Sequence, residues 1–303
     1  MTDNDFVIHT EGLTKSYGKQ RGILDIDLNI KRGEVFGYLG PNGAGKTTTI
    51  RTLLHFLFPT RGRATIFGLN IVQKSLEIRR RIGYLPGELE VYDNLTGAEL
   101  LDFLSHLRGG VDWQYVHELA TRFDYDLSQK IKTLSHGNRQ KVGLIQAFMN
   151  KPELLILDEP TIGLDPLMQQ EFYRIIGEVK AEGKTVFLSS HIMPEVERIC
   201  DRVAIIREGC LIAVEDVDAL KARAIRRLEI HFATPVSSEH FSNIASVRDV
   251  QVNDSILTCS VTGELDALIK AAAQYQVINV ISHEPSMEEI FLAYYNQGDS
   301  GVA

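Results

Sequence analysis

A nine-residue segment, GPNGAGKTT from Gly40 to Thr48, constrains this chain of 303 residues more than any other feature. It follows a short apolar segment, Glu34–Leu39, which predicts a buried strand, and it leads into a predicted helix from about Gly45. Glycines let the backbone of such a loop wrap an anion closely, so that several N–H groups point at phosphate oxygens. The spacing G-x-x-x-x-G-K-[ST] between a strand and a helix therefore predicts a nucleoside triphosphate site.

Two side chains of this loop have predicted chemical roles. We expect Lys46 to reach the β- and γ-phosphates, and the Thr47 hydroxyl to complete part of a Mg²⁺ shell. A glycine turn that matches the pattern by chance is the competing interpretation, and the strand–loop–helix context argues against it. The residues expected to surround the phosphates are Gly40, Pro41, Asn42, Gly43, Ala44, Gly45, Lys46, Thr47 and Thr48.

A second apolar strand, within LLILDEP, ends in two carboxylates. Asp158 suits the outer shell of Mg²⁺, and Glu159 is placed to polarise an attacking water. Phosphoryl transfer depends mainly on positioning, so a fixed acceptor beside the metal is what the Gly-rich loop lacks. Taken alone, an Asp-Glu pair after a strand is more often a solvated strand end. In a chain that also has Gly40–Thr48, it predicts the second half of a hydrolytic site.

The fold class expected for the first 215 residues is α/β, a P-loop NTPase cassette with a mainly parallel core sheet. Short apolar segments such as KTVFLSSH and DRVAIIREG do not alternate with polar residues and are separated by helical patterns. This arrangement is typical of a parallel sheet covered on both faces. The stretch from about Ile82 to Gln146 contains helical patterns without a convincing core strand. We predict that it is an inserted helical subdomain.

Residues 216–303 have a different pattern and predict a small α+β domain. Segments such as RRLEIHFA and ILTCSV alternate like half-exposed strands, and the predicted order is β-α-β-β-α-β. This order matches the ferredoxin-like pattern. The segment EPSMEEIFLAYYN then predicts an amphipathic helix with Met287, Ile290, Phe291 and Tyr294 along one face.

Composition limits the cellular context. The formal net charge of −8 argues against a general nucleic-acid partner, which needs a basic face. The three cysteines, Cys200, Cys210 and Cys259, lack metal-ligand spacing and favour reduced thiols in the cytoplasm. The first residues are acidic where a signal peptide is basic, and no apolar run approaches roughly 18 residues. We expect a cytoplasmic protein whose membrane role comes through a partner.

The segment TLSHGNRQK, residues 133 to 141, predicts a second anion-binding helix start. Its Ser, Gly and Asn precede a basic stretch, and a helix N-terminus presents free N–H groups to a negative ligand. With this segment, six elements in order make roughly the first 215 residues similar to the nucleotide-binding subunit of ATP-binding-cassette (ABC) transporters. They are Tyr17 in KSYG, the Walker A motif at Gly40–Thr47, the signature motif at Leu134–Asn138, the Walker B strand at Leu154–Glu159, the D-loop at Gly163–Asp165 and the switch histidine His191.

The resemblance implies an ATPase that uses ATP and Mg²⁺. It implies catalytic roles for Glu159, His191 and Lys46, and a role for Tyr17 in stacking on adenine. Alone, His191 would more often be a satisfied loop or core histidine, and Tyr17 a packing residue. In the family, each signature motif caps the γ-phosphate of ATP held by a second subunit. Ser135 and Gly137 would therefore serve a partner cassette, and we expect a dimer, as a homodimer.

Two departures from the family pattern bear on this expectation. The signature has His136 and Asn138 where Gly and Gln are commonest, and we expect His136 to point away from the phosphates. The family places a metal-sensing glutamine directly after YLP, but Gly87 stands there, followed by Glu88. Either Glu88 takes over the metal-side contact or the loop couples to its membrane partner by shape alone. We favour Glu88 as a metal-side residue.

The order of one cassette followed by a small β-α-β-β-α-β domain resembles the ATPase subunits of bacterial ABC-2-type exporters. That resemblance implies a separate integral membrane permease, a position on the inner face of the cell membrane, and export of a drug, lipid, ion or polysaccharide. We expect the permease to contact residues near Glu88–Thr96 and the helical insertion. Two alternatives are a soluble ABC ATPase acting on ribosomes or DNA and a cassette that binds ATP without hydrolysing it. NKPE at Asn150–Glu153 approximates a guanine-reading N-K-x-D motif but leads directly into the Walker B strand, so adenine is favoured.

Overall fold

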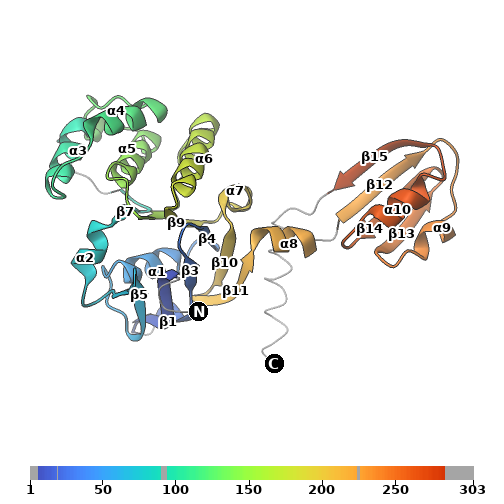
Figure 1. Cartoon of the computed structure of the whole chain (residues 1–303), viewed down its shortest axis with the longest axis horizontal. Helices are drawn as coiled ribbons and strands as arrows, with labels where there is room; N and C mark the ends of the chain where they lie inside the picture. Colours follow the sequence, from blue (N-terminus) through green and yellow to red (C-terminus); the bar gives the residue numbers. More distant parts are fainter. Residues whose placement is uncertain (1–5, 19, 90–93, 224–225, 284–303) are drawn as a thin grey trace. The chain divides into compact units, whose positions relative to one another are not determined.

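The computed structural model describes residues 6–18, 20–89, 94–223 and 226–283 (Figure 1). The chain divides into two compact units, Met1–Val214 and Glu215–Ala303, which we describe separately. Within the described residues, no helix combines the length and apolar character needed to cross a membrane. The predicted helix that contains Met287 and Tyr294 lies outside the described residues.

A six-stranded sheet forms the centre of the first unit. Its strands lie in the order β11 (Cys210–Asp216), β10 (Arg202–Arg207), β4 (Val35–Leu39), β9 (Thr185–Ser190), β8 (Leu154–Asp158) and β7 (Ile82–Leu85). The pairings from β10 through β7 are all parallel, and every residue of β4, β8 and β9 is buried. The parallel sheet predicted from unalternating apolar segments is confirmed, with both faces covered as such sheets require.

One boundary predicted from the sequence is wrong. The stretch from Ile82 was assigned to the helical insertion, but Ile82–Leu85 forms the edge strand β7 and pairs in parallel with β8. Four apolar residues are too few to distinguish a buried strand from a buried helical turn by periodicity. Gly83 lets α5 approach closely, because a Cβ there would lie 2.0 Å from the carbonyl oxygen of Ala147. The helical part begins later, at Gly97.

Three α-helices and one 3₁₀ turn make up this helical part. They are α3 (Gly97–His106), α4 (Trp113–Arg122), η1 (Ile131–Thr133) and α5 (His136–Phe148). Helix α3 starts with a capping box, in which the Thr96 side chain accepts from the Glu99 N–H and the Glu99 carboxylate accepts from the Thr96 N–H. Helix α4 starts at Asp112, whose carboxylate caps its first turn.

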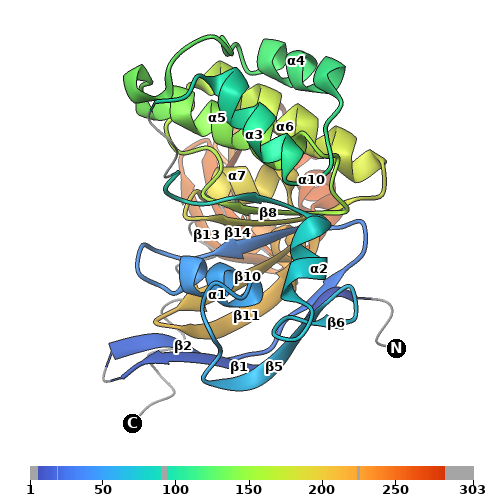
Figure 2. The same ribbon diagram turned by 90° about the vertical axis from the view of Figure 1, so that its left-hand side faces the viewer.

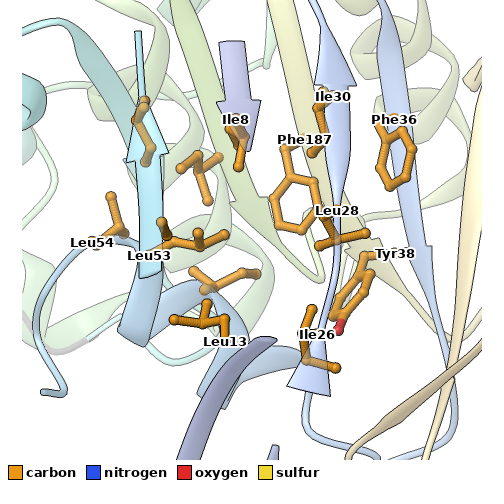
Figure 3. Close-up of a cluster of buried hydrophobic side chains, with 14 of the residues drawn as sticks. Ile8, Leu13, Ile26, Leu28, Ile30, Phe36, Tyr38, Leu53, Leu54 and Phe187 are labelled. Carbon is orange, nitrogen blue, oxygen red and sulfur yellow. The ribbon is translucent and has the colours of Figure 1, made fainter. Parts of the chain in front are cut away.

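A second, antiparallel sheet was not predicted from the sequence. It contains β1 (Phe6–Tyr17), β2 (Gln20–Ile26), β3 (Asn29–Lys31), β5 (Arg61–Ile66) and β6 (Leu69–Asn70). Its inward side chains and those of the core sheet form one cluster, in which Phe187 of β9 lies near Leu28 and Tyr38 (Figure 3). Helix α1 (Lys46–Leu53) also packs into this cluster through Ile50 and Leu53.

The remaining helices of the first unit cover the core sheet. Helices α5, α6 (Pro166–Ala181) and α7 (Met193–Ile199) lie on one face, and α1 lies on the other with the antiparallel sheet (Figure 2). A further short helix, α2 (Ser75–Arg80), precedes β7. The carboxyl ends of β4, β8 and β9 therefore meet at one edge of a sheet that is buried on both faces. Ligands of open α/β sheets bind at this edge.

Within the described residues, the second unit is a four-stranded antiparallel sheet with three short helices. Its elements are α8 (Val217–Arg223), β12 (Arg226–Phe232), α9 (Glu239–Ser242), β13 (Val247–Asn253), β14 (Ile256–Val261), α10 (Asp266–Ala272) and β15 (Val277–His283). The strands lie in the order β13-β14-β12-β15, and all three pairings are antiparallel. Leu228, Ile230, Phe241, Leu257 and Leu268 belong to its separate hydrophobic core.

Candidate nucleotide-binding and hydrolysis site

The Gly-rich loop between β4 and α1 has the backbone that its glycines predict. Gly43 and Gly45 have positive φ angles of 80° and 111°, which favour glycine. A Cβ at Gly45 would also lie 2.9 Å from the Cγ2 atom of Ile23. Lys46 is buried, and its Nζ donates to the carbonyl oxygens of Gly40, at 2.6 Å, and Pro41, at 3.2 Å. The loop therefore curves around its own lysine.

Three side chains from different segments meet beside this loop. Lys46 Nζ lies 3.0 Å from Glu159 Oε1, and His191 Nδ1 lies 2.8 Å from Glu159 Oε2. The first contact is an ion pair without hydrogen-bond geometry, because Oε1 has no hydrogen-bond partner in the described structure. Glu159 follows β8 and His191 follows β9, adjacent parallel strands. The three residues predicted to be catalytic are therefore in contact.

The backbone of Glu159 is held in an uncommon conformation. Its φ angle is 53°, in the left-handed region that non-glycine residues seldom adopt. Its N–H donates to the carbonyl oxygen of Ser189 at 3.2 Å and to Ser189 Oγ at 3.0 Å, contacts that hold this strained turn. Strain of this kind occurs at functional sites where the surroundings determine it. Here it turns the Glu159 carboxylate towards Lys46 and His191.

Asp158 is fully buried at the end of β8. Its Oδ1 accepts a hydrogen bond from Ser189 Oγ at 2.5 Å, whereas Oδ2 is buried without a partner in the described structure. A buried carboxylate oxygen without a partner is costly, and such atoms mark places where an ion or water belongs. The half-buried Thr47 supplies a hydroxyl from the adjacent loop. These donors fit a Mg²⁺ ion, which needs few protein oxygens when phosphates complete its shell.

Gly87, where the family pattern has glutamine, lies against Asp158. A Cβ at this position would be 3.2 Å from Asp158 Oδ2, the oxygen that has no partner. Glu88 is exposed. Within the part of the chain that the structure describes, no cluster of three His, Cys, Asp or Glu side chains could hold a metal. A role for Glu88 beside the metal stays a prediction.

The signature segment lies at the start of α5. Ser135 is the N-cap and accepts a hydrogen bond from the Asn138 N–H, at 3.3 Å. Gly137 is required for packing, because a Cβ there would lie 2.5 Å from the carbonyl oxygen of Gly163. The His136 ring also packs on Gly163, because a Cβ at Gly163 would lie 2.4 Å from His136 Nδ1. The signature segment and the D-loop are therefore fitted to each other within one chain.

Sequence reasoning missed two residues of this site. Gln140 of α5 is buried, and its side-chain N–H groups donate to the carbonyl oxygens of Glu159, at 3.1 Å, and Pro160, at 2.9 Å. Ser189 joins the backbone of Glu159 to the carboxylate of Asp158. The polar pair that ends the apolar strand Thr185–Ser190 is the signal that could have indicated Ser189. Nothing local indicates Gln140.

Tyr17 lies at the end of β1 and is 43% exposed. Its Cδ2 atom would be 3.3 Å from a Cβ at Gly22, next in sequence to Ile23, which packs on Gly45. Lys15 Nζ lies 5.4 Å from the centre of its ring. The structure thus brings Tyr17 to the neighbourhood of the Gly-rich loop, with an exposed ring suited to stacking.

Comparison with known proteins identifies the family. A family model described as ABC transporter matches residues 23–162. The bacitracin transport ATP-binding protein BcrA of Bacillus licheniformis is 35% identical to this chain, covering 97% of the chain and 99% of BcrA. The chain belongs to the ABC transporter ATP-binding proteins. The linearmycin resistance ATP-binding protein LnrL of Bacillus subtilis (strain 168) is 32% identical over 94% of this chain and 97% of its own length.

Solved structures agree with this assignment. An ATP-binding subunit of an ABC transporter, 32% identical, superposes with a TM-score of 0.66 and covers 71% of this chain and 92% of its own. The dimeric bacterial ABC transporter cassette MJ0796 is 23% identical and superposes with a TM-score of 0.64. The match covers 69% of this chain and 98% of MJ0796, and it shows the shared fold. This ABC subunit is an ATPase that powers a separate membrane permease. The recognition of an ABC cassette from its sequence motifs is confirmed.

Proposed function

We propose that this chain energises the export of an antibiotic-like or other drug-like compound. The observation that carries the proposal is the meeting of Lys46, Glu159 and His191 at the carboxyl edge of the core sheet, beside the Gly-rich loop. Relatives that align over almost the whole chain are named for bacitracin transport and linearmycin resistance, which supports this class of cargo. Lipids, ions and polysaccharides are the other cargo classes that the resemblance to bacterial exporters implies.

The residues of the site have distinct roles in hydrolysis. Backbone N–H groups of Gly40–Thr48 and the Lys46 ammonium hold the phosphates, and the ring of Tyr17 stacks on adenine. The Glu159 carboxylate accepts a proton from the attacking water and orients it, because its strained backbone fixes its direction. His191 donates to the γ-phosphate and holds Glu159 through the 2.8 Å contact.

Thr47 and Asp158 would hold Mg²⁺, with Asp158 Oδ2 as the buried oxygen that has no protein partner. When bound, the ion neutralises charge on the phosphates. Ser189 fixes the other oxygen of Asp158, which leaves Oδ2 directed away from that hydrogen bond. Glu88 is proposed to lie at the outer edge of this metal shell. It would take the role of the family's glutamine, whose position Gly87 occupies in this chain.

A second copy of this chain completes the site. Ser135 is exposed at the N-terminus of α5, and Gly137 packs on the D-loop of its own chain. A helix start with an exposed N-cap serine suits a phosphate from outside the chain. The proposal is that Ser135 and Gly137 cap the γ-phosphate bound by the partner cassette, in a head-to-tail homodimer. The likeness to a dimeric cassette fold supports this arrangement.

The permease would bind at a cavity of about 250 Å³ in the first unit. Its walls come from the end of α1, from β7, and from helices α3 and α5. Phe56 is 50% and Leu107 70% exposed at this cavity, and large exposed apolar side chains mark interaction surfaces. Arg79 packs over the Phe56 ring at 5.7 Å. A short amphipathic helix of the permease fits such a surface, and it would hold the subunit at the inner face of the membrane.

The second unit is proposed to be a ferredoxin-like domain that regulates or stabilises the dimer. Its strand order β13-β14-β12-β15 and its antiparallel pairings support that fold. The proposed boundary places the nucleotide-binding domain at residues 1–215 and this domain at residues 216–303. The compact division after Val214 is consistent with this boundary.

Light scattering of the purified Glu159→Gln protein, with and without Mg-ATP, tests the proposal. We expect ATP-dependent dimers, because blocked hydrolysis retains the nucleotide between two cassettes. The dimers should be lost in Glu159→Gln combined with Ser135→Arg, while ATP binding persists. A protein that stays monomeric with ATP bound would contradict the homodimer. Wild-type turnover in the single variant would contradict the role of Glu159.

A further inference from the structure

A buried carboxylic acid lies directly behind the hydrolytic residues. Glu195, in the first turn of α7, is 1% exposed. Its Oε2 accepts a hydrogen bond from Ser190 Oγ at 2.6 Å, and Ser190 Oγ accepts from the Ile192 N–H at 2.9 Å. These two contacts enclose the turn of residues 190–192, which carries His191. The position of His191 is therefore connected to a carboxyl group that touches neither nucleotide nor metal ligands.

The same carboxyl group also faces the loop that follows Glu159. The side chain of Thr161, itself buried, lies close enough to Glu195 to favour its ionised form, which lowers the pKa of Glu195. It does not complete a hydrogen bond, since Glu195 Oε1 is buried without a partner in the described structure. Glu195 thus lies between the two loops that carry Glu159 and His191. Its geometry suits a residue that fixes their separation.

The surroundings of Glu195 disfavour its negative charge. Burial is the largest cause and raises its pKa to about 7, while Ser190 and Thr161 oppose the rise. The titratable groups that act on it or that it acts on are Glu159 after β8, His191 after β9, Tyr173 of α6 and Cys200 at the end of α7. The charge of Glu159 disfavours ionisation, and His191 favours it.

We propose that Glu195 is a positioning residue that supports hydrolysis only while it is protonated. Neutral Glu195 fixes the turn of His191 and adds no negative charge behind the γ-phosphate site. When Glu195 ionises, a second carboxylate faces Glu159 within the buried interior, where charges interact strongly. The turnover number then falls because His191 and Glu159 separate, while ATP binding through Gly40–Thr48 is little affected. This inference rests on the proposed function of Glu159 and His191.

The test is the pH dependence of steady-state ATPase activity in full-length Glu195→Gln, Glu195→Ala and wild-type proteins. Gln keeps the shape and hydrogen bonding of a neutral Glu. We expect Glu195→Gln to match wild-type kcat at pH 6.5 and to exceed it about threefold or more at pH 8.5, since a group with a pKa near 7 is then almost fully ionised. Relative to Glu195→Gln, Glu195→Ala should lower kcat about tenfold at both pH values, with KM for ATP changed less, as loss of a positioning contact predicts.

Glu197→Gln is the matched control, because it removes a carboxylate two residues further along the same helix. Its pH profile should follow that of the wild type. Superimposable profiles for Glu195→Gln and wild type would overturn the proposal. Glu159→Gln, measured in parallel, separates the two claims. If it retains activity, the proposed hydrolytic site is wrong; if it is inactive and Glu195→Gln behaves as wild type, only the role of Glu195 is wrong.

Discussion

The core sheet of the first unit and the sheet of the second unit differ in how their faces are used. In the first unit, β4, β8 and β9 are buried along their whole length, so only their ends reach solvent. In the second unit, β12 alternates between buried and more exposed residues, and β13 is largely exposed. A sheet buried on both faces concentrates its chemistry at the carboxyl edge. A half-exposed sheet instead offers a broad surface for contacts.

The largest effect is expected when one carboxylate oxygen of Glu159, at the carboxyl edge of the core sheet, is replaced by an amide nitrogen. Glu159→Gln keeps the shape of the side chain but cannot accept a proton. We expect kcat to fall about 100-fold or more, which is the usual contribution of a general base. Steady-state phosphate release measures the effect, and fluorescent ATP binding checks that the site still forms. Thr258→Ala, on an exposed position of β14, is the control and should leave both unchanged.

Matched core truncations separate the two units. Phe187 in β9 and Phe241 in α9 are both fully buried, and each Ala substitution should cost about 3–5 kcal/mol. Phe187→Ala is expected to lower the unfolding free energy of the first unit and also the ATPase rate, since β9 carries Ser189 and His191. Phe241→Ala should destabilise the second unit while ATP binding persists. Thermal unfolding monitored with nucleotide binding would distinguish them, and equal loss of ATP binding in both variants would contradict independent cores.

Glu195 adds a pH dependence to the stability of the first unit. Its pKa is about 7 in the folded state, against an ordinary value of 4.5. The stability that this group contributes is complete below pH 4.5 and is lost as the pH rises to 7, because the unfolded chain loses the proton first. Relative to Glu195→Gln, the wild type should lose about 3 kcal/mol over this interval. Urea unfolding of both proteins at pH 5 and pH 8 measures this loss. If the difference between their unfolding free energies is the same at both pH values, the pKa of Glu195 is not raised in the folded state.

The smallest effect is expected at Glu88. If this exposed residue lies at the outer edge of the metal shell, Glu88→Ala should slow hydrolysis about twofold to fivefold, the size of a weak, solvent-screened charge interaction. Gln at the same position keeps the polar group and is the control. Turnover equal to that of the wild type would remove Glu88 from the site and leave Gly87 as a coupling element that acts by shape.

The sequence predicted those parts of the site that depend on local chain geometry. Gly40–Thr48 forms the loop expected of it, because glycine torsions and the strand–helix context are encoded within a few residues. The buried strands ending at Asp158 and Ser190 were also predictable from continuous apolar runs. Strand β7 was misassigned because its identity depends on pairing with β8 and on the close approach of α5. The antiparallel sheet of the first unit was missed.

By itself, the sequence determined that this chain binds a nucleoside triphosphate and resembles an ABC cassette, because the motif residues and their order are covalent facts. Only the tertiary structure decided which side chains, distant in the sequence, contact these motif residues. Gln140 contacts the carbonyl oxygen of Glu159 across 19 positions, and Ser189 reaches Asp158 across 31. The pKa of Glu195 is raised only because packing of α7 against the core sheet removes the carboxyl group from water. Burial depends on every neighbour in space, and no local pattern records it.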